Sequence, residues 1–376
     1  MKAGSRIHCG QRTPFLPTFI WLYPTYACNL NCRHCSVALL RNLDIGNVET
    51  WIRALDLNLL NNIKKTGAKI RIKISGGEPL ILKDKLFDIL KVINEFSEKI
   101  FIETNGTLVN SSFIEKLVPF HGKIEFSVSI DGLEETHDKI RGKIGAFRSA
   151  IQGLKLLNKY GMLNETITVI QDENIRELDR LVKYLYNDLN VTKIRLLLPI
   201  RLGRGRLLIK NFEDILRLYK VIVNILRKYK DTGINFTHNI PPALLPKDLW
   251  SLMRPQLCGW GRDLIGVLPN LDIGVCGDIQ DNRLTFGNIK KRSIIEVLSS
   301  SKLAWKLAKM TQKDKRGVCR YCLAWKICRG FCLVESFYYY GELEAPGVLC
   351  QEFYNNTMFP NYALEEETPK GELEYP

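Results

Sequence analysis

Three cysteines near the N-terminal end of the chain have the residue type and spacing best suited to chemistry. Cys28, Cys32 and Cys35 fall within eight residues, spaced four and then three apart. Thiolates this close in one loop can bind the same metal centre, and three protein ligands on a four-iron cluster leave one iron open for a reactant. The alternative is three buried structural cysteines. It fits less well, because the group directly follows an apolar strand pattern.

Seven more cysteines gather towards the C-terminal end, and none lies between Cys35 and Cys258. They are Cys258, Cys276, Cys319, Cys322, Cys328, Cys332 and Cys350, and Cys9 is the eleventh cysteine of the chain. In a long chain without a secretory signal, this many cysteines indicate metal binding rather than disulfides. Seven thiols are too many for one tetrahedral site, so they predict two sites, one complete and one short of a ligand. A zinc ribbon is the alternative.

The composition sets the broad class of protein. The chain has 376 residues, of which 45% are hydrophobic and 25% charged, so it can form a full core, and its length predicts two domains. No run of about 18 apolar residues exists that could cross a membrane. Prolines interrupt the apolar stretch Phe15–Tyr23, which also lacks a small-residue cleavage site. We therefore expect neither a membrane segment nor a signal peptide, and predict a cytoplasmic protein.

The charge of the chain is strongly positive. It is +14 overall, and the tail at 363–376 carries five Glu and one Lys, so the tail contributes −4 and the rest +18. Such a surface can attract an acidic peptide, an anionic small molecule or nucleic acid. Lysines spread over helix faces, however, often only keep a protein hydrated. No nucleic-acid-binding motif is visible, so we expect no nucleic-acid partner.

Strand patterns alternate with helix patterns from residue 20 to residue 198. The predicted strands are Ile20–Tyr26, Ile70–Ile74, Ile100–Glu103, Ile124–Ile130, Thr166–Ile170 and Ile194–Leu198. The predicted helices are Glu49–Thr66, Lys83–Ser97, Ser111–Leu117, Ala146–Tyr160 and Ile175–Asn187, followed by an amphipathic helix at 211–230. This alternation predicts parallel strands with right-handed crossovers. The expected fold is α/β, a partial (β/α)6 barrel resembling a TIM barrel.

Polar motifs follow four of these strands. They are the cysteine loop, Ser75-Gly76-Gly77-Glu78-Pro79, Glu103-Thr104-Asn105-Gly106 and Ser127–Gly132. In open parallel sheets and barrels, ligands bind at the carboxyl ends of the strands. Two glycines let the backbone approach a ligand closely, and a Glu can accept a hydrogen bond from an ammonium group. Because all four motifs occupy that position, we expect them to form one site.

These motifs together resemble those of radical S-adenosylmethionine (radical SAM) enzymes. Cys28, Cys32 and Cys35 match the cysteine motif of that superfamily without a gap. The resemblance implies a [4Fe-4S] cluster whose open iron binds the amine and the carboxylate of SAM.

The same resemblance implies which residues contact SAM. Gly76, Gly77 and Glu78 match the segment that holds the SAM amino group. The other expected contacts are Ser129, Asn105 and Asp131 near the ribose or methionine part, Arg141 at the SAM carboxylate, and His34 beside the adenine. The alternatives are a surface salt bridge for Arg141 and a solvent-facing loop position for His34. No catalytic residue is assigned.

The C-terminal cysteines resemble the SPASM extension of radical SAM enzymes that modify peptides and proteins. Members typically carry two auxiliary [4Fe-4S] clusters there, so the resemblance implies three clusters in all. By position, the ligands of the distal auxiliary cluster would be Cys319, Cys322, Cys328 and Cys350. The ligands of the cluster nearer to the active site would be Cys258, Cys276 and Cys332.

The near auxiliary cluster departs from the fullest family pattern, which has an eighth cysteine. Leu264 occupies that position, so the fourth ligand is unknown, and Cys9, a carboxylate such as Asp263, the substrate or water could supply it. Sulfatase-maturing members also place an aspartate directly after the equivalent of Cys276. Here Asp278 comes one position later, which weakens the sulfatase-maturase interpretation.

Five segments make up the predicted organisation. They are an N-terminal extension (1–17), a radical SAM partial barrel (18–206), a helical linker (207–257), a small cysteine-rich SPASM domain (258–353) and an acidic C-terminal tail (354–376). Only 27 residues precede Cys28, too few for a leader-peptide-binding domain. We therefore expect the barrel, the extension or a separate leader-peptide-binding protein to hold any precursor peptide.

The resemblance predicts an enzyme that cleaves SAM reductively to a 5′-deoxyadenosyl radical. The expected substrate is a peptide or protein, modified by oxidation, crosslinking or epimerisation, and a ferredoxin or flavodoxin would donate the electron. The first alternative is a small anionic substrate such as a tetrapyrrole intermediate, because the body is basic and arginines cluster at Arg195–Arg206. The second alternative is a non-enzymatic iron–sulfur electron-transfer protein.

Overall fold

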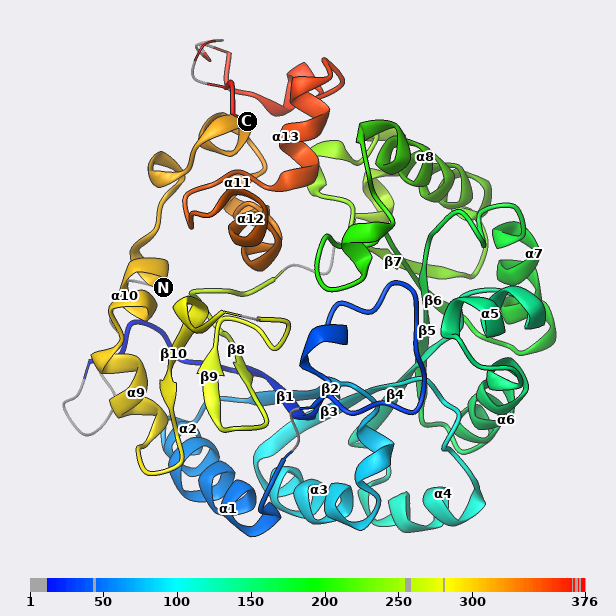
Figure 1. The fold of residues 1–376 in the computed structure, drawn as a ribbon, viewed down its shortest axis with the longest axis vertical. Coiled ribbons are helices and arrows are strands. Elements are labelled where there is room, and N and C mark those ends of the chain that lie inside the picture. Colours follow the sequence, from blue (N-terminus) through cyan, green and yellow to red (C-terminus); the bar gives the residue numbers. More distant parts are fainter. Residues whose placement is uncertain are drawn as a thin grey trace.

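A curved parallel sheet forms the centre of the fold. The computed structural model describes residues 12–42, 45–253, 258–279, 281–366, 368, 371 and 373–375. The first seven strands are β1 (Phe19–Thr25), β2 (Ile70–Gly76), β3 (Ser97–Thr104), β4 (Ile124–Ser129), β5 (Leu163–Val169), β6 (Lys193–Leu197) and β7 (Asn235–His238). Each pairs in parallel with the next, in sequence order. With helices on its outer side, the sheet is the predicted partial barrel of the TIM type (Figure 1).

Helices connect these strands on the outside of the sheet. They are α1 (Val48–Arg53), a π-helical segment (Ala54–Leu60), α2 (Asn61–Lys64), α3 (Asp84–Phe96), α4 (Ser111–Leu117), α5 (Glu134–Arg141), α6 (Ala146–Lys159), α7 (Leu178–Lys183), a second π-helical segment (Tyr184–Asp188) and α8 (Phe212–Tyr229). Asparagines cap three of them: the side chains of Asn47, Asn110 and Asn211 each accept a backbone N–H of the first turn. The apolar faces turn to the sheet, and α8 for example buries Ile222 and Leu226.

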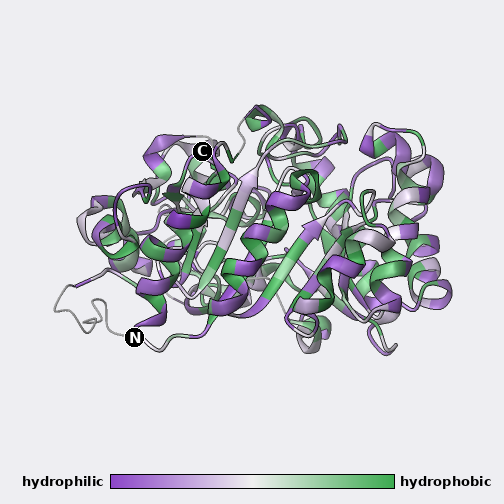
Figure 2. Cartoon of the chain, turned by 90° about the horizontal axis from the view of Figure 1, so that it is seen from below, coloured by the Kyte–Doolittle hydropathy of each residue, from purple (hydrophilic) through white to green (hydrophobic). Residues whose placement is uncertain are grey.

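Alternation along the strands separates the core from the barrel interior. On β6, Ile194 and Leu196 are fully buried, whereas Arg195 between them reaches a carboxylate of β3. Strands β3 and β6 are not neighbours, so this contact crosses the inside of the barrel. Because successive side chains of a strand point to opposite faces, the apolar residues face the helices. Figure 2 shows hydrophobic residues along the strands and hydrophilic ones on the outer helix surfaces.

The C-terminal part extends the same sheet and adds short helices. Strand β8 (Leu264–Val267) pairs in parallel with β1, and β9 (Asp272–Gly274) and β10 (Thr285–Asn288) follow as antiparallel strands. The sheet of the described residues thus has ten strands in the order β10-β9-β8-β1-β2-β3-β4-β5-β6-β7. The helices that follow are α9 (Ile294–Ser300), α10 (Lys302–Lys309), α11 (Trp325–Cys328), α12 (Leu333–Tyr340) and α13 (Val348–Asn355). Figure 1 shows α12 and α13 lying between the β8–β10 edge and α8.

Two elements differ from the sequence prediction. Strand β7 lies within 207–257, where a helical linker was expected, so the barrel has a seventh parallel strand; its four residues are too few for a clear alternating pattern. Helix α5 was not predicted, because Glu134–Arg141 is mostly charged and shows little apolar periodicity. Across the described ranges, no helix is long and apolar enough to span a membrane.

Candidate active site and cluster-binding cysteines

The loop with Cys28, Cys32 and Cys35 follows β1 at the carboxyl end of the sheet. The three cysteines pack in one cluster with Leu30 and Ala146, and Cys32 is buried. Burial favours the neutral thiol and raises the pKa of Cys28 to about 11. A metal bound here would therefore compete with the proton of each thiol.

The C-terminal end of α5 holds this loop in place. The backbone N–H groups of Asn31 and Arg33 donate to the carbonyls of Arg141 and Ile140, at 3.0 and 2.9 Å. Gly142, with φ 68°, permits the approach, because a Cβ there would lie 2.8 Å from the Asn31 carbonyl oxygen. The helix that the sequence did not predict thus positions the cysteine loop.

Arg141 and Asp131 form a buried ion pair beside the loop. Arg141 Nη2 lies 2.7 Å from Asp131 Oδ2, and Nη1 donates to Cys32 Sγ at 3.6 Å. Burial opposes ionisation of Asp131, but Arg141, together with weaker interactions with His34, His137 and the Val169 N–H, lowers the carboxyl pKa. The pair is not the surface salt bridge of the alternative prediction, since the Arg141 side chain is only 7% exposed. A bound carboxylate would share this guanidinium with Asp131.

His34 turns towards the same pair. Its Nε2 lies 3.7 Å from Asp131 Oδ2, and its Nδ1 lies 3.3 Å from Gln171 Nε2. Burial lowers the pKa of His34 to about 4, so the ring is neutral at pH 7. The alternative of a solvent-facing histidine is wrong, because this side chain is 11% exposed.

The glycines after β2 are needed for a close approach of two backbones. Gly76 has φ 117°, and a Cβ there would lie 2.4 Å from the Thr25 carbonyl oxygen. A Cβ on Gly77 would lie 2.0 Å from the Ala27 carbonyl oxygen. The Gly77 N–H donates to the Thr25 carbonyl at 2.9 Å, so this segment packs directly against the residues that lead into Cys28.

Glu78 is buried and accepts three hydrogen bonds. The donors are the Thr104 hydroxyl at 2.7 Å and the backbone N–H groups of Asn105 at 2.7 Å and Leu80 at 3.2 Å. Asn105 in turn donates through Nδ2 to Asn29 Oδ1 at 2.8 Å. Burial raises the pKa of Glu78. These bonds join the ends of β2 and β3 to the cysteine loop.

The residues predicted to contact SAM lie at one edge of the sheet. The ends of β2, β3 and β4 carry Gly76, Gly77, Glu78, Asn105, Ser129 and Asp131, and the cysteine loop and α5 carry His34 and Arg141. The hydrogen bonds described above bring most of them against the loop of Cys28, Cys32 and Cys35. Their contacts with SAM itself stay predictions.

Cys258, Cys276 and Cys332 form a second group beside the barrel, here called the near group. They precede β8, follow β9 and precede α12, respectively. Burial raises the pKa of Cys332, and the negative charges of Glu335, Cys258 and Cys276 raise it further, as expected for neighbours. The fourth ligand is not apparent: Asp263 adds negative charge next to Cys258, and Cys9 lies outside the described residues.

The other four cysteines line one cavity and are here called the distal group. They are Cys319, Cys322, Cys328 and Cys350. Apolar side chains, among them Val318, Trp325 and Phe359, form most of the remaining wall. The backbone N–H of Gly347 donates to Cys319 Sγ at 3.3 Å, and burial raises the pKa of Cys322 to about 12.

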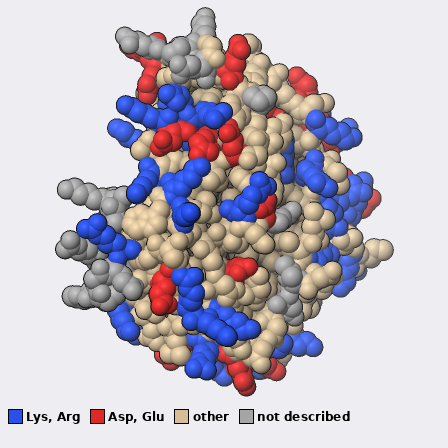
Figure 3. Space-filling model, turned by 60° about the vertical axis from the view of Figure 1, so that its left-hand side comes forward, with Lys and Arg blue, Asp and Glu red and all other residues tan. Residues whose placement is uncertain are grey.

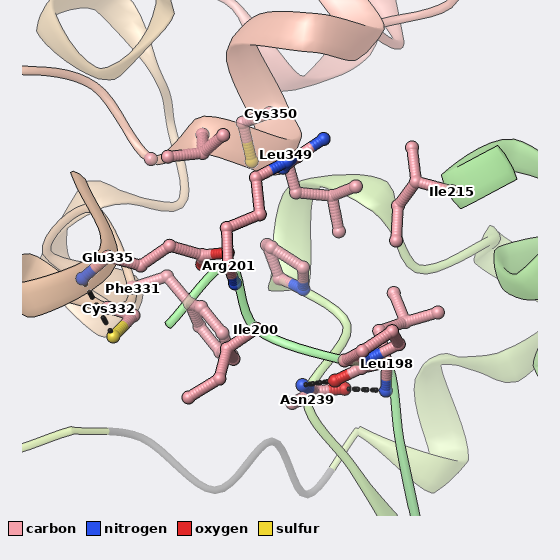
Figure 4. A pocket seen from close by; sticks show the side chains of 14 residues that line it. Leu198, Ile200, Arg201, Ile215, Asn239, Phe331, Cys332, Glu335, Leu349 and Cys350 are labelled. Atoms are coloured by element: carbon pink, nitrogen blue, oxygen red, sulfur yellow. Dashed lines mark hydrogen bonds between the residues drawn. The ribbon is translucent and has the colours of Figure 1, made fainter. Parts of the chain in front are cut away.

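A cleft lies between the barrel rim and these cysteine groups (Figure 4). Cys332 and Cys350 both contribute to its lining. Arg201 crosses it: Nη2 donates to both carboxylate oxygens of Glu352 at 2.6 Å, and the backbone N–H donates to Glu335 Oε1 at 2.9 Å. Figure 4 shows the Glu335 side chain directed towards Arg201, away from the sulfur of Cys332. This rim arginine therefore joins the barrel to the C-terminal part.

The barrel interior contains charged side chains of which the sequence had indicated only Arg195, as part of the Arg195–Arg206 cluster. Lys73 Nζ lies 3.2 Å from Glu103 Oε1, Arg195 Nη1 lies 3.1 Å from the same oxygen, and Arg195 also pairs with Glu165. Burial opposes ionisation of Glu103, but Lys73 and Arg195 lower its pKa to about 2. Lys73 and Arg195 each lie between two buried apolar residues of a strand, and this alternation is the sequence signal that could have revealed them.

The cysteine groups fit iron–sulfur clusters in their donor chemistry. Each iron of a [4Fe-4S] cluster takes one protein thiolate, and the groups hold three, three and four cysteines, none of them in a disulfide. Among the residues that the structure describes, no three His, Cys, Asp or Glu side chains are arranged to hold a single metal ion.

A partial (β/α) barrel with a three-cysteine loop at its carboxyl edge and further buried thiol groups defines a class of iron–sulfur enzymes. Residues 22–185 match the family model of the Radical SAM superfamily, and residues 258–323 match SPASM, an iron–sulfur cluster-binding domain. The chain belongs to the radical SAM superfamily and carries a SPASM domain, as predicted. It is therefore an enzyme that uses SAM and [4Fe-4S] clusters. These matches favour iron–sulfur clusters over a zinc ribbon, and an enzyme over a non-enzymatic electron-transfer protein.

The relatives fall into two functional groups. The AdoMet-dependent heme synthase of Methanosarcina barkeri is 32% identical over 182 residues, 48% of this chain and 50% of that protein, so the match spans half of that relative. The Fe-coproporphyrin III synthase of the same organism is 26% identical over 360 residues, 89% of this chain and 87% of that protein. The mycofactocin maturase MftC of Mycobacterium ulcerans is 24% identical over 364 residues, 93% of this chain and 91% of that protein.

A solved structure shares the fold. Streptococcus suis SuiB bound to precursor peptide SuiA superposes with a TM-score of 0.69 at 19% identity, and the match covers 90% of this chain and 77% of that chain. The likeness supports the arrangement of barrel and C-terminal extension described above.

Proposed function

We propose that this radical SAM enzyme modifies a peptide or protein by abstracting a hydrogen atom, followed by oxidation, crosslinking or epimerisation. The observation that carries the proposal is the pair of buried cysteine groups, near and distal, beyond the SAM-binding loop. When bound, SAM and the loop cluster supply a 5′-deoxyadenosyl radical that removes hydrogen from the substrate. Two additional cluster sites suit a reaction in which the substrate must then release an electron.

The chain's own residues prepare the SAM site. Cys28, Cys32 and Cys35 would hold the first cluster and leave one iron for SAM. Glu78 would accept from the SAM ammonium group with the lone pairs that its three protein donors leave free. Asn105, held by its bond to the loop, is within the same edge and would face the ribose or methionine part.

Residues of α5, the cysteine loop and the end of β4 suit the carboxylate, adenine and ribose of SAM. Arg141 keeps a buried positive charge for the SAM carboxylate, and Asp131 fixes the orientation of that guanidinium through the 2.7 Å pair. The neutral ring of His34 would lie beside the adenine. Ser129, at the end of β4, would contact the ribose.

The barrel interior supports a peptide substrate. Lys73 and Arg195 balance Glu103 and Glu165, so the four charges sum to zero and offer no free cation to a substrate carboxylate. Such a polar but neutral interior suits a peptide segment better than an anionic molecule. The similarity to the maturase MftC over 93% of this chain points the same way.

An open groove on the rim also suits an extended chain. Its lining includes Arg206, Lys210, Tyr338 and Tyr339, with Arg201 at one side. Aromatic and basic side chains together bind extended, acidic peptides well. We propose that a precursor peptide enters along this groove, with a separate leader-peptide-binding protein as a further partner.

Two arginines favour a second candidate substrate, a tetrapyrrole intermediate. Nε and Nη2 of Arg41 and of Arg204 are buried and find no hydrogen-bond partner within the described residues. Arg204 lies at the cysteine loop, since its backbone N–H donates to the Cys35 carbonyl at 2.9 Å. Propionate groups of a tetrapyrrole would pair with such guanidinium groups. The 26% identity to Fe-coproporphyrin III synthase over 89% of this chain supports this candidate.

The surface charge suits an acidic electron donor of the ferredoxin or flavodoxin kind. The net charge is +14, and Figure 3 shows lysine and arginine side chains spread over much of one face, with acidic side chains beside some of them. Opposite charges steer such carriers to their partners and make the association weaker at high salt.

The first test concerns SAM cleavage. The reconstituted enzyme, with SAM and a chemical reductant, is expected to form 5′-deoxyadenosine. A variant with Cys28→Ala, Cys32→Ala and Cys35→Ala should form none, while its C-terminal cysteines still bind iron. Continued 5′-deoxyadenosine formation by this variant would contradict the proposal.

The second test separates the two substrates. Co-expression with short peptides encoded beside the gene should yield a peptide with fewer hydrogen atoms or, for epimerisation in D2O, with incorporated deuterium, and mass spectrometry detects both. A porphyrin-type intermediate converted in place of any peptide would favour the second candidate.

A further inference from the structure

A lysine in the barrel wall, Lys73, is buried and held from two sides. It lies on β2 and is 6% exposed. Its Nζ lies 3.4 Å from the centroid of the Trp21 ring and 3.2 Å from Glu103 Oε1. A cation–π contact on one side and a carboxylate on the other fix the ammonium in position.

The neighbours of Lys73 in the sheet show what lies next to this ammonium. Lys73 pairs with Trp21 on β1, and Trp21 pairs with Gly266 on β8. A Cβ on Gly266 would lie 2.4 Å from the carbonyl carbon of Cys276, so the backbone of Cys276 occupies that space. Adjacent strands are about 4.8 Å apart, which puts Gly266 about 10 Å from Lys73 between Cα atoms. The ammonium lies over the ring of Trp21, the residue that stands between Lys73 and Gly266 in the sheet.

The charges around the near group agree with this geometry. Burial raises the pKa of Cys276 and of Cys258, and Lys73 acts in the opposite direction on both. The acidic groups in the same region are Asp278, Glu103, Asp263 and Glu335, and Lys73 offsets the first two.

Stability alone does not require a lysine at this position. A buried ion pair often stabilises a protein no better than apolar side chains of the same size, because both charges lose their hydration. Apolar side chains at both position 73 and position 103 could fill the space over Trp21 without burying a charge, and Arg195 would keep its partner Glu165. The positive charge itself is therefore the property to explain.

We propose that Lys73 is a positioning residue for electron transfer, whose ammonium raises the reduction potential of the cluster held by Cys258, Cys276 and Cys332. The inference rests on the proposed function, in which this cluster accepts one electron from the substrate radical. An added electron makes a cluster one charge more negative, and a cation fixed nearby stabilises that reduced form. The substrate radical loses this electron and a proton and becomes a closed-shell oxidised product.

The experiment measures the midpoint potential of each cluster in the full reconstituted chain, by redox titration followed with EPR. Lys73→Gln is expected to lower the potential of the near cluster, and Lys73→Arg to keep it close to the wild-type value. Glu103→Gln removes a negative charge that is bound to Lys73 and is expected to raise it. Potentials of the loop cluster and the distal cluster should stay unchanged.

A matched control uses another lysine of the sheet. Lys99 on β3 lies 2.5 Å from Glu125 and also donates to the Gly122 carbonyl, at the amino end of the strands. Lys99→Gln removes a paired lysine of the same kind from the far end of the barrel, so the near cluster should keep its potential.

Two results overturn the inference in different ways. A near cluster that keeps its potential in Lys73→Gln, with its iron retained, refutes the role of Lys73 and leaves the proposed function standing. If the wild-type chain binds no near cluster, both the role of Lys73 and the proposed function are refuted. If the Lys73→Gln variant does not hold iron, the Glu103→Gln variant provides the test. A near-cluster potential that is unchanged or lower in Glu103→Gln contradicts the inference.

Discussion

The near and distal cysteine groups differ in number of thiols and in surroundings. The distal group has four thiols in a cavity whose walls are mostly apolar, with one buried lysine, Lys315, near Cys319. The near group has three thiols, and charged side chains of the barrel, of the segment after β9 and of α12 act on it. These are Lys73, Asp278 and Glu335, with Glu103 behind Lys73.

The contrast suggests different tasks for two sites of the same chemistry. Four thiols saturate a [4Fe-4S] cluster, and apolar walls keep water from it, which suits a site that only passes electrons. Three thiols leave the fourth ligand of the near cluster unassigned, and nearby charges would couple its potential to the barrel interior. We therefore expect the near cluster to respond to the substrate site more than the distal cluster. The predictions that follow test this contrast, from the largest expected effect to the smallest.

The largest effect is expected from loss of a distal ligand. Cys350→Ala should remove about four irons and lower the thermal stability strongly, because the cluster fills the cavity around which this region packs. Cys332→Ala is the matched change in the near group. It should also remove about four irons, with a smaller loss of stability, because the charged barrel side chains nearby can be hydrated. Iron analysis and thermal unfolding measure both. Equal losses of stability would contradict the contrast.

The next effect concerns two glycines, one beside each group. A Cβ on Gly277 would lie 1.7 Å from a ring carbon of Tyr23, which is buried, whereas a Cβ on Gly347 would lie 2.9 Å from the Gly330 carbonyl oxygen. Gly277→Ala should therefore lower the free energy of unfolding by about 1–3 kcal/mol and broaden the EPR signal of the near cluster. Gly347→Ala should have the smaller effect, on the distal signal. If Gly277→Ala changed neither the free energy of unfolding nor the EPR signal, the contact with Tyr23 would not constrain the near group.

The stability of the barrel should also depend on pH under acidic conditions, through His238 of β7. Burial lowers the pKa of His238 to about 4 from the ordinary 6.5. As the pH falls below 6.5, the unfolded chain therefore binds a proton before the folded chain does. The contribution of neutral His238 to the free energy of unfolding is complete above that pH and decreases towards pH 4. His238→Phe should remove this part, about 1 kcal/mol at pH 5.5. Urea unfolding of the two proteins at pH 7 and pH 5.5 tests it, and an equal pH dependence would contradict the assignment.

The smallest expected effect is spectroscopic. An added small ligand, such as cyanide, should bind the open iron of the near cluster and change its EPR signal, while the saturated distal cluster keeps its own. A changed distal signal would mean that its four thiols do not saturate it.

Much of the fold could be predicted from the sequence, because strands and helices of the barrel have strong local patterns. The six predicted strands each overlap an observed one, and Cys319, Cys322, Cys328 and Cys350 line one cavity. Helix α5 was missed because its residues are mostly charged, and it proves to be the element that holds the cysteine loop.

The missed parts of the site depend on contacts between distant residues. Arg201 and Glu352 are 151 positions apart, and no local pattern links them. Lys73 and Glu103 lie on neighbouring strands, and Arg195 reaches Glu103 only because the sheet curves into a barrel. The residue types alone do not tell whether Gly76 and Gly77 allow the close approach of a ligand or of another backbone segment. The structure shows both packed against the segment before Cys28.

The central claim is that the chain holds three clusters, and an iron and sulfide count after anaerobic reconstitution tests it most directly. The account predicts about twelve irons in the wild type, and about eight in the variant that lacks Cys28, Cys32 and Cys35. About four irons in the wild type, all lost in that variant, would contradict both C-terminal cluster sites.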